Sequence, residues 1–164
     1  SEEVFATRMA DNLDALIINE GPETVAAFFA EPVMGAGGII LPPETYFDKI
    51  QAVLRKHDVL LVADEVICGF GRTGNMWGCE TYTIRPDILT MAKALSSGYI
   101  PIAAVMISDE IYHEIAAETE RQGVLGHGFT YSGHPASCSV ALENLKIVEN
   151  EKLVEKVKHE TGPH

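Results

Sequence analysis

The run Val59–Ala63 constrains the fold more than any other segment, because every residue in it is apolar. A strand with one face in water alternates apolar and polar residues, so an unbroken apolar run of this length predicts a strand buried on both faces. Such strands occur in parallel sheets whose two faces are covered by helices. The run therefore favours an α/β fold.

The segments around this run carry complementary patterns. Periodic apolar positions predict helices over residues 3–20, 44–57, 109–120 (capped by Ser108 or Asp109) and 135–158. Short apolar runs predict further strands over residues 24–30, 39–41, 88–91 and 102–107. Strands that alternate with helices predict a mainly parallel sheet flanked by helices.

Composition narrows the class of protein. The chain has 164 residues, of which 46% are hydrophobic, which is typical of a globular domain. Its net charge of −12 argues against binding to nucleic acid or to an anionic membrane through bulk charge. No stretch approaches the ~20 apolar residues that a membrane span needs. Three scattered cysteines without a CxxC pair indicate a reducing compartment, and we expect a cytoplasmic protein.

The two ends of the chain bear on its organisation. A helical pattern begins directly after Ser1, and the chain stops shortly after another helical pattern. We therefore expect residues 1–164 to form one partial domain of a longer protein, with parts missing on both sides.

A glycine-rich loop follows the strand predicted over residues 24–30. The segment Gly35-Ala36-Gly37-Gly38 is similar to the start of a dinucleotide-binding fingerprint. That fingerprint needs a third glycine and a helix N-terminus to bind phosphate, but here Ile40 occupies the glycine position and two prolines follow. The pattern therefore disfavours a nucleotide-binding module.

Two histidines stand in the loop before the last predicted helix. His127 and His134 have no cysteine or acidic partner at ligand spacing, so we predict loop histidines that make hydrogen bonds and no metal site.

The acidic pair Asp64-Glu65 comes where the buried strand ends. Ligands of open α/β sheets bind at the carboxyl ends of the strands, so a carboxylate at this point can meet a ligand. A strand-end acid can equally cap a turn, and position alone does not decide between the two roles.

Lys93 is the only charged residue between Asp87 and Asp109. A lysine in such an apolar setting is ordinarily a surface residue whose stem covers apolar neighbours. If it is partly buried, its pKa falls and it becomes a nucleophile that can form a Schiff base. A strand-end acid and a desolvated lysine together fit a pyridoxal phosphate site, although their spacing alone leaves both readings open.

Longer motifs favour the second reading. The segments LLVADEVICGFGRTG (60–74) and PDILTMAKALSSG (86–98) resemble the signature of class III pyridoxal-phosphate aminotransferases, and AEPVMGAGG (30–38) and GFTYSGHP (128–135) agree with it. This resemblance covers essentially the whole chain. It implies the second half of the large, cofactor-binding domain of a fold type I enzyme, which acts as a homodimer.

The resemblance also implies roles for individual residues. Lys93 would form the Schiff base with the cofactor and move the proton, and Asp64 would pair with the pyridine nitrogen. Val66 would pack against one face of the ring. Thr130 would bind the cofactor phosphate of the neighbouring subunit, and Glu31 would support the site without touching the cofactor. Arg72-Thr73-Gly74 would be loop structure.

Two departures from the family pattern bear on the substrate. Members that act on ornithine, acetylornithine or 4-aminobutyrate carry a glutamate where this chain has Ala36, which disfavours those substrates. The GAGG segment resembles the amine:pyruvate branch, also called ω-transaminases. Met34 stands where many relatives have a glutamine that contacts the ring hydroxyl, and Met34 cannot donate that hydrogen bond.

The resemblance thus implies an aminotransferase that moves an amino group from an amine or ω-amino acid to a keto acid such as pyruvate. The glycine–serine–glutamate loop that binds the cofactor phosphate in this family is not in this chain, so the chain alone should be weakly active or inactive. An aminomutase on the same scaffold, and a non-catalytic fragment that pairs with a partner chain, remain the alternative hypotheses.

Overall fold

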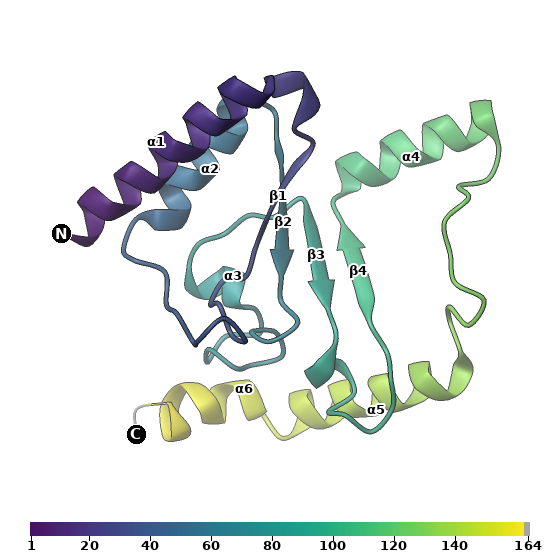
Figure 1. Cartoon of the computed structure of the whole chain (residues 1–164). Coiled ribbons are helices and arrows are strands. Elements are labelled where there is room, and N and C mark those ends of the chain that lie inside the picture. The colour runs from purple at the N-terminus through teal and green to yellow at the C-terminus, as the bar shows by residue number, and fades with distance from the viewer. Residues whose placement is uncertain (163–164) are drawn as a thin grey trace.

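A four-stranded sheet forms the centre of the molecule in the computed structural model, which describes residues 1–162 (Figure 1). Its strands follow one another in chain order: β1 (Ala27–Ala30), β2 (Leu60–Asp64), β3 (Ile88–Met91) and β4 (Ala104–Ile107). The first three strands run parallel, and β4 pairs antiparallel with β3. The expectation of an α/β fold with a mainly parallel sheet is confirmed.

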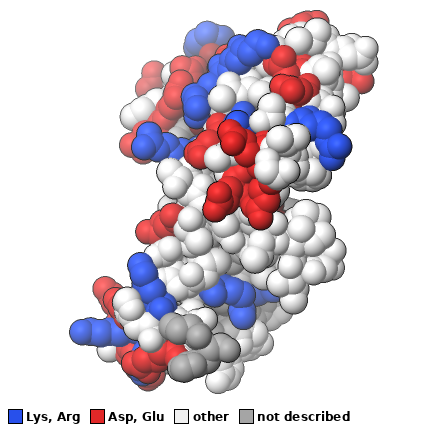
Figure 2. Space-filling model, turned by 90° about the vertical axis from the view of Figure 1, so that its left-hand side faces the viewer, with Lys and Arg blue, Asp and Glu red and all other residues white. Residues whose placement is uncertain are grey.

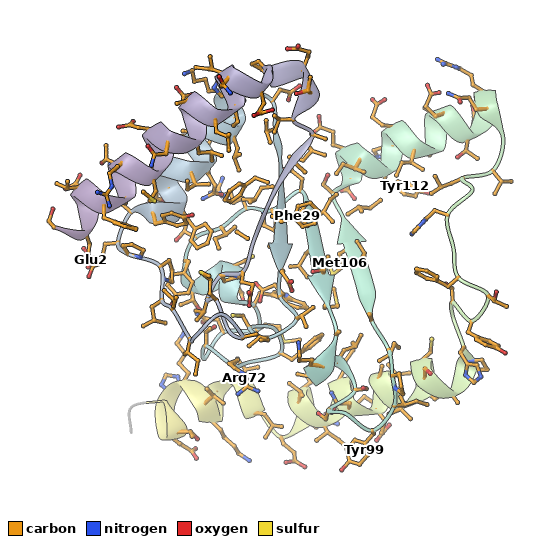
Figure 3. All side chains as sticks on the ribbon, in the orientation of Figure 1. Glu2, Phe29, Arg72, Tyr99, Met106 and Tyr112 are labelled. Carbon is orange, nitrogen blue, oxygen red and sulfur yellow. The ribbon has the colours of Figure 1, made fainter. Side chains whose placement is uncertain are left out.

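The central strand behaves as its composition predicts. Leu61, Val62 and Ala63 of β2 are all buried, because β2 has neighbours on both sides and side chains packed on both faces. The apolar strand β4 is different, since all four of its residues are exposed. It is an edge strand, so an apolar composition alone did not predict its burial. Phe29 on the opposite edge, β1, is 70% exposed (Figure 3).

Two helices pack together beside β1 and β2 and build the larger core (Figure 1). These are α1 (Glu2–Glu20), capped by the Ser1 side chain, and α2 (Tyr46–Lys56). The buried residues of this core include Ile17, Ile50, Leu54, Leu61 and Ala63. Figure 2 shows Lys and Arg interspersed with Asp and Glu on this side of the molecule, with no single continuous basic area.

A second, smaller core lies under α5 (Pro135–Asn150), which runs along one end of the sheet (Figure 1). Its buried members are Leu89 and Met91 of β3, Leu95 and Ala141. The preceding helix, α4 (Asp109–Gln122), begins as predicted, with the Ser108 hydroxyl accepting a hydrogen bond from the Ile111 N–H.

Several predicted boundaries were wrong. No strand forms over residues 39–41; instead Ile40 makes an isolated bridge with Met34 and closes a turn. The first predicted strand begins later than expected, because Pro22–Thr24 form the 3₁₀-helix η1. The final predicted helix breaks after Asn150, since Lys152 takes a left-handed backbone with φ 50°. The short helix α6 (Leu153–Lys156) and the π-helix η3 (Val157–Thr161) follow.

None of the helices within residues 1–162 combines the length and the apolar character that a membrane crossing requires.

Candidate active site

Asp64 is the last residue of β2 and stands at the carboxyl end of the parallel part of the sheet. Its side chain is half-buried, and its Oδ1 accepts a hydrogen bond from the Val66 N–H at 3.0 Å. This turn fixes one carboxylate oxygen, whereas Oδ2 has no hydrogen bond within the described residues. Asp64 thus offers a negatively charged acceptor at the strand end, where a ligand of such a sheet is expected.

Lys93 lies at the same end of the neighbouring strand. Asp64 pairs with Thr90 in the register of β2 and β3, and Lys93 follows Thr90 by three positions. The Glu65 N–H donates to the Thr90 carbonyl at 2.9 Å, which continues the pairing past the end of β2. Because the two strands are parallel, the acid and the lysine both lie at the same end of the sheet, where the carboxyl ends of these strands meet.

The backbone at Lys93 is unusual. Lys93 opens the 3₁₀-helix η2 (Lys93–Leu95) with a left-handed φ of 40°. This conformation costs a residue with a side chain about 1–2 kcal/mol, and such strain is found preferentially at functional sites.

Of the two settings that the sequence left open for this lysine, the described part of the chain shows the exposed one. Lys93 is exposed and not partly buried, because the turn carries it beyond the end of β3 while Leu95 is the residue that packs inward. Its amino group makes no hydrogen bond or ion pair within residues 1–162. The amine is therefore available to a ligand but is not desolvated by this chain.

Glu65 has a structural role that differs from that of its neighbour. Its side chain is 0% exposed, and its two carboxylate oxygens accept hydrogen bonds from the backbone N–H groups of Gly78 (2.9 Å) and Cys79 (2.7 Å). These donors form the first turn of α3 (Gly78–Thr81), where a negative charge is favourable. Burial, and secondarily Glu65, raises the pKa of the Cys79 thiol. Of the acidic pair, Asp64 faces the site and Glu65 ties the loop after β2 to α3.

The glycine-rich loop after β1 is closed by Glu31. The Gly35 N–H donates to Oε2 of Glu31 at 2.9 Å, and the bridge between Met34 and Ile40 follows. No helix begins directly after these glycines, as the sequence predicted, so the loop lacks the helix N-terminus of a dinucleotide site.

A cavity of about 530 Å³ lies between this loop, α1 and α2, and Asp64 borders it. Its lining is mostly apolar and includes Phe5, Phe28, Met34 and Phe47. Glu31 and Asp64 are its two acidic members, so the cavity adjoins the end of β2 that carries the predicted site.

The other predicted site residues lie in different parts of the structure. Val66 follows Asp64 and is half-buried in the loop after β2. Thr130 is exposed in the loop between α4 and α5, which Figure 1 shows beyond β4, and it makes no hydrogen bond within residues 1–162. The structure thus places Asp64, Val66 and Lys93 at the carboxyl ends of β2 and β3, and it places Thr130 in a separate loop.

Of the two histidines of that loop, His134 makes the predicted hydrogen bond and His127 makes none within residues 1–162. Nδ1 of His134 accepts from the Ala136 N–H at 3.3 Å and caps α5, while the ring of His127 packs edge-on against Phe129. Arg72 is exposed in the loop after β2, close to α6 in Figure 3. Among the described residues, no cluster of three or more His, Cys, Asp or Glu side chains could hold a metal ion.

Comparison with known proteins shows the family of the chain. The family model for class-III aminotransferases matches residues 1–162. The chain belongs to the class-III aminotransferase family. This membership confirms the resemblance drawn from the segments around Asp64 and Lys93, and it makes the chain part of a family that uses pyridoxal phosphate.

Individual aminotransferases are similar over almost the whole chain. The vanillin aminotransferase of Capsicum frutescens is 62% identical, with 96% of this chain and 34% of that protein aligned. The chloroplastic gamma aminobutyrate transaminase 3 of Solanum lycopersicum is 60% identical over 96% of this chain and 30% of its own length. The omega transaminase from Pseudomonas jessenii, solved in complex with PMP, is 58% identical, with a TM-score of 0.94 over 96% of this chain and 35% of that chain. The chain therefore spans about a third of the length of these relatives.

Asp64 and Lys93, at the carboxyl ends of β2 and β3, suit the cofactor of this aminotransferase family. Pyridoxal phosphate needs a carboxylate near its ring nitrogen and an amine near its aldehyde carbon. Asp64 has one carboxylate oxygen held by the Val66 N–H and the other without a partner in residues 1–162, and the Lys93 amine is likewise unpaired there. The donor set of this chain therefore fits the cofactor.

Proposed function

We propose that this chain supplies the lysine-bearing part of a pyridoxal-phosphate-dependent aminotransferase site in a longer protein. The reaction moves an amino group from an amine or ω-amino acid to a keto acid, for which we propose pyruvate. The observation that carries this proposal is the placement of Asp64 and Lys93 at the carboxyl ends of two adjacent parallel strands. Family membership and the similarity to solved transaminases support it.

Bound pyridoxal phosphate supplies an electron-withdrawing ring that stabilises negative charge on the carbon of the amino donor. Asp64 would keep a proton on the ring nitrogen, because a carboxylate favours a positive charge beside it. Lys93 would hold the cofactor through Nζ, and the same amine, when free, would move a proton from the donor carbon to the cofactor. Val66 would limit the position of the ring from one face.

Other parts of the chain would supply the remaining contacts of the proposed site, to the cofactor phosphate and to the substrate. Thr130 is exposed in the loop between α4 and α5, which Figure 1 shows beyond β4, and this suits a residue that binds the cofactor phosphate of a second copy. We therefore propose a homodimer in which each site is shared between subunits. The cavity beside Asp64 would receive apolar parts of the substrate, since most of its lining residues are apolar.

The donor and acceptor are proposed from the relatives. Their names include gamma aminobutyrate and vanillin, so 4-aminobutyrate stands among the candidate donors. The earlier inference against 4-aminobutyrate rested on Ala36 alone, and the 60% identity with gamma aminobutyrate transaminases weighs against it. A donor with an apolar body and a terminal amine is the class that fits the cavity best.

The experiment uses the full-length protein that contains this chain. Amino transfer is measured from 4-aminobutyrate to pyruvate, and from L-alanine to vanillin as an aldehyde acceptor, in the wild type and in Lys93→Ala. The matched control is Lys146→Ala, which removes an exposed lysine of α5 whose amine pairs with Glu143. Loss of both reactions in Lys93→Ala alone supports the proposal, and activity retained by Lys93→Ala would refute it.

A further inference from the structure

The turn that carries Lys93 is held from α5 by one side chain, Asn144. Nδ2 of Asn144 donates to the carbonyls of Ala94 at 2.8 Å and Leu95 at 3.2 Å. Its Oδ1 accepts from the Ser97 hydroxyl at 2.6 Å. Both polar ends of a single amide therefore bind the segment 94–97, from a helix some fifty residues further along the chain.

Apolar packing beside these bonds fixes the same two elements together. Leu95 is buried against Ala141, and Leu145 packs on the same cluster. Residues three and four positions apart share one helix face, so Asn144 projects from α5 on the side of Ala141 and Leu145. The two bonds from Nδ2 are partly buried beside this apolar cluster, which strengthens them relative to bonds in water, whereas the bond with Ser97 is exposed.

The turn requires such support because its backbone is strained. Lys93 and Ser97 both take left-handed conformations, with φ of 40° and 51°. Its own backbone bonds are those of short turns, from the N–H groups of Leu95, Ser96 and Ser97 to the carbonyls of Ala92, Lys93 and Ala94. The Ser96 hydroxyl adds a bond to the Ile100 carbonyl at 2.6 Å. Strained residues persist only where their surroundings over-determine them.

We propose that Asn144 is a positioning residue for Lys93. By binding the carbonyls just after the lysine, it holds the strained turn closed and presents the lysine at the carboxyl end of β3. The proposal rests on the proposed cofactor role of Lys93.

The first test follows the turn itself in the cofactor-free, full-length protein. Hydrogen exchange of the Leu95, Ser96 and Ser97 amides is compared in the wild type and in Asn144→Ala. The loss of two donors should speed this exchange roughly tenfold relative to the amides of β2, because unmade bonds to buried carbonyls destabilise the closed turn. The control Asn150→Ala removes an exposed asparagine from the end of the same helix and should leave the exchange unchanged.

The second test separates positioning from stability. The rate at which the cofactor-free protein captures pyridoxal phosphate at Lys93 is followed by absorbance and confirmed by borohydride reduction and peptide mapping. Asn144→Asp keeps the size of the side chain and its acceptor for Ser97 but loses the donors to the two carbonyls. We expect capture to slow about tenfold in this variant, since a misplaced reacting group loses the benefit of orientation.

Milder variants keep the test decisive if Asn144→Ala folds poorly. Ser97→Ala removes one of the three bonds and should slow capture by a smaller factor, whereas Ser139→Ala, whose hydroxyl bonds only within α5, should not. Unchanged capture and turn exchange in a folded Asn144→Asp or Ser97→Ala would overturn the proposal even if the melting temperature falls. If the wild type captures no cofactor at Lys93, the proposed function fails and the Asn144 proposal fails with it.

Discussion

Asp64 and Thr90 are partners across the parallel strands β2 and β3, and the Thr90 carbonyl also accepts the N–H of Glu65. This register sets the end of both strands at one level. The acid therefore leaves the sheet beside the segment that leads, through Met91 and Ala92, to Lys93. In the proposed function an acid and a lysine must lie near one ring, and this pairing places Asp64 and Lys93 after the ends of neighbouring strands.

The carboxylate of Asp64 should matter for the rate more than for the fold. Asp64→Asn keeps an oxygen that can accept the Val66 N–H but removes the negative charge. We expect amino transfer by the full-length protein to slow about 10²-fold or more, because a fixed charge that stabilises the reacting state is lost. Single-turnover kinetics measure this effect. Asp11→Asn, at an exposed site of α1, is the control, and equal rates in the two variants would contradict the role of Asp64.

Glu65 should matter for stability. Glu65→Gln leaves one acceptor oxygen for the two N–H donors of Gly78 and Cys79 and places an amide group against the other. We expect the free energy of unfolding to fall by about 1–3 kcal/mol, because a buried N–H donor loses its acceptor. Thermal unfolding of the full-length protein, with Glu149→Gln on the surface of α5 as the control, measures it. A melting temperature equal to that of the control would show that the two bonds do not stabilise the loop.

A charge cluster between α1 and α2 should make stability depend on acidity. Lys56 Nζ donates to both oxygens of Asp14 (2.7 and 2.9 Å), and His57 Nε2 lies 2.6 Å from Oδ1. The hydrogen bond from Lys56, and then that from His57, lowers the pKa of Asp14 below its usual 3.8.

Since the folded pKa of Asp14 is the lower one, the carboxylate stabilises the fold above pH 3.8, and this contribution is lost as the pH falls through the folded pKa. The stability difference between the wild type and Asp14→Asn should therefore be constant near neutrality and shrink below about pH 4. Denaturant unfolding across this range measures the difference. A stability difference that grows as the pH falls would contradict the lowered pKa of Asp14.

The cysteines should differ in reactivity. Burial raises the pKa of the thiols of Cys68 and Cys79, whereas Cys138 is exposed on α5. Alkylation requires the thiolate and access to it, so iodoacetamide at about pH 8 should modify Cys138 first in the folded chain. Peptide mapping by mass spectrometry after short exposure reads this order. Modification of Cys79 before Cys138 would contradict the packing around α3.

Part of this fold and site follows directly from sequence patterns. The unbroken apolar run before Asp64 predicted a buried parallel strand, and β2 is one. The capping signal at Ser108 predicted the start of α4. Both are local effects, in which the residue types of one segment determine its own conformation and burial.

The remainder depends on contacts between distant segments. The apolar run of β4 does not reveal that the strand is an exposed edge, because its exposure depends on which elements lie beside it. The bonds from Asn144 to the turn after Lys93 join two segments that no periodicity connects. The structural role of Glu65 had one signal, a second acid directly after a strand-end acid in an apolar setting, but its donors in α3 are visible only in the fold.

Lys93 is the proposed attachment point of pyridoxal phosphate in the full-length protein. The most direct measurement incubates that protein with the cofactor, reduces it with borohydride and maps the modified peptide by mass spectrometry. We expect one dominant label, on Lys93, in a folded protein whose Lys146→Ala variant is labelled identically. A folded protein labelled at several surface lysines with no preference for Lys93 would contradict it.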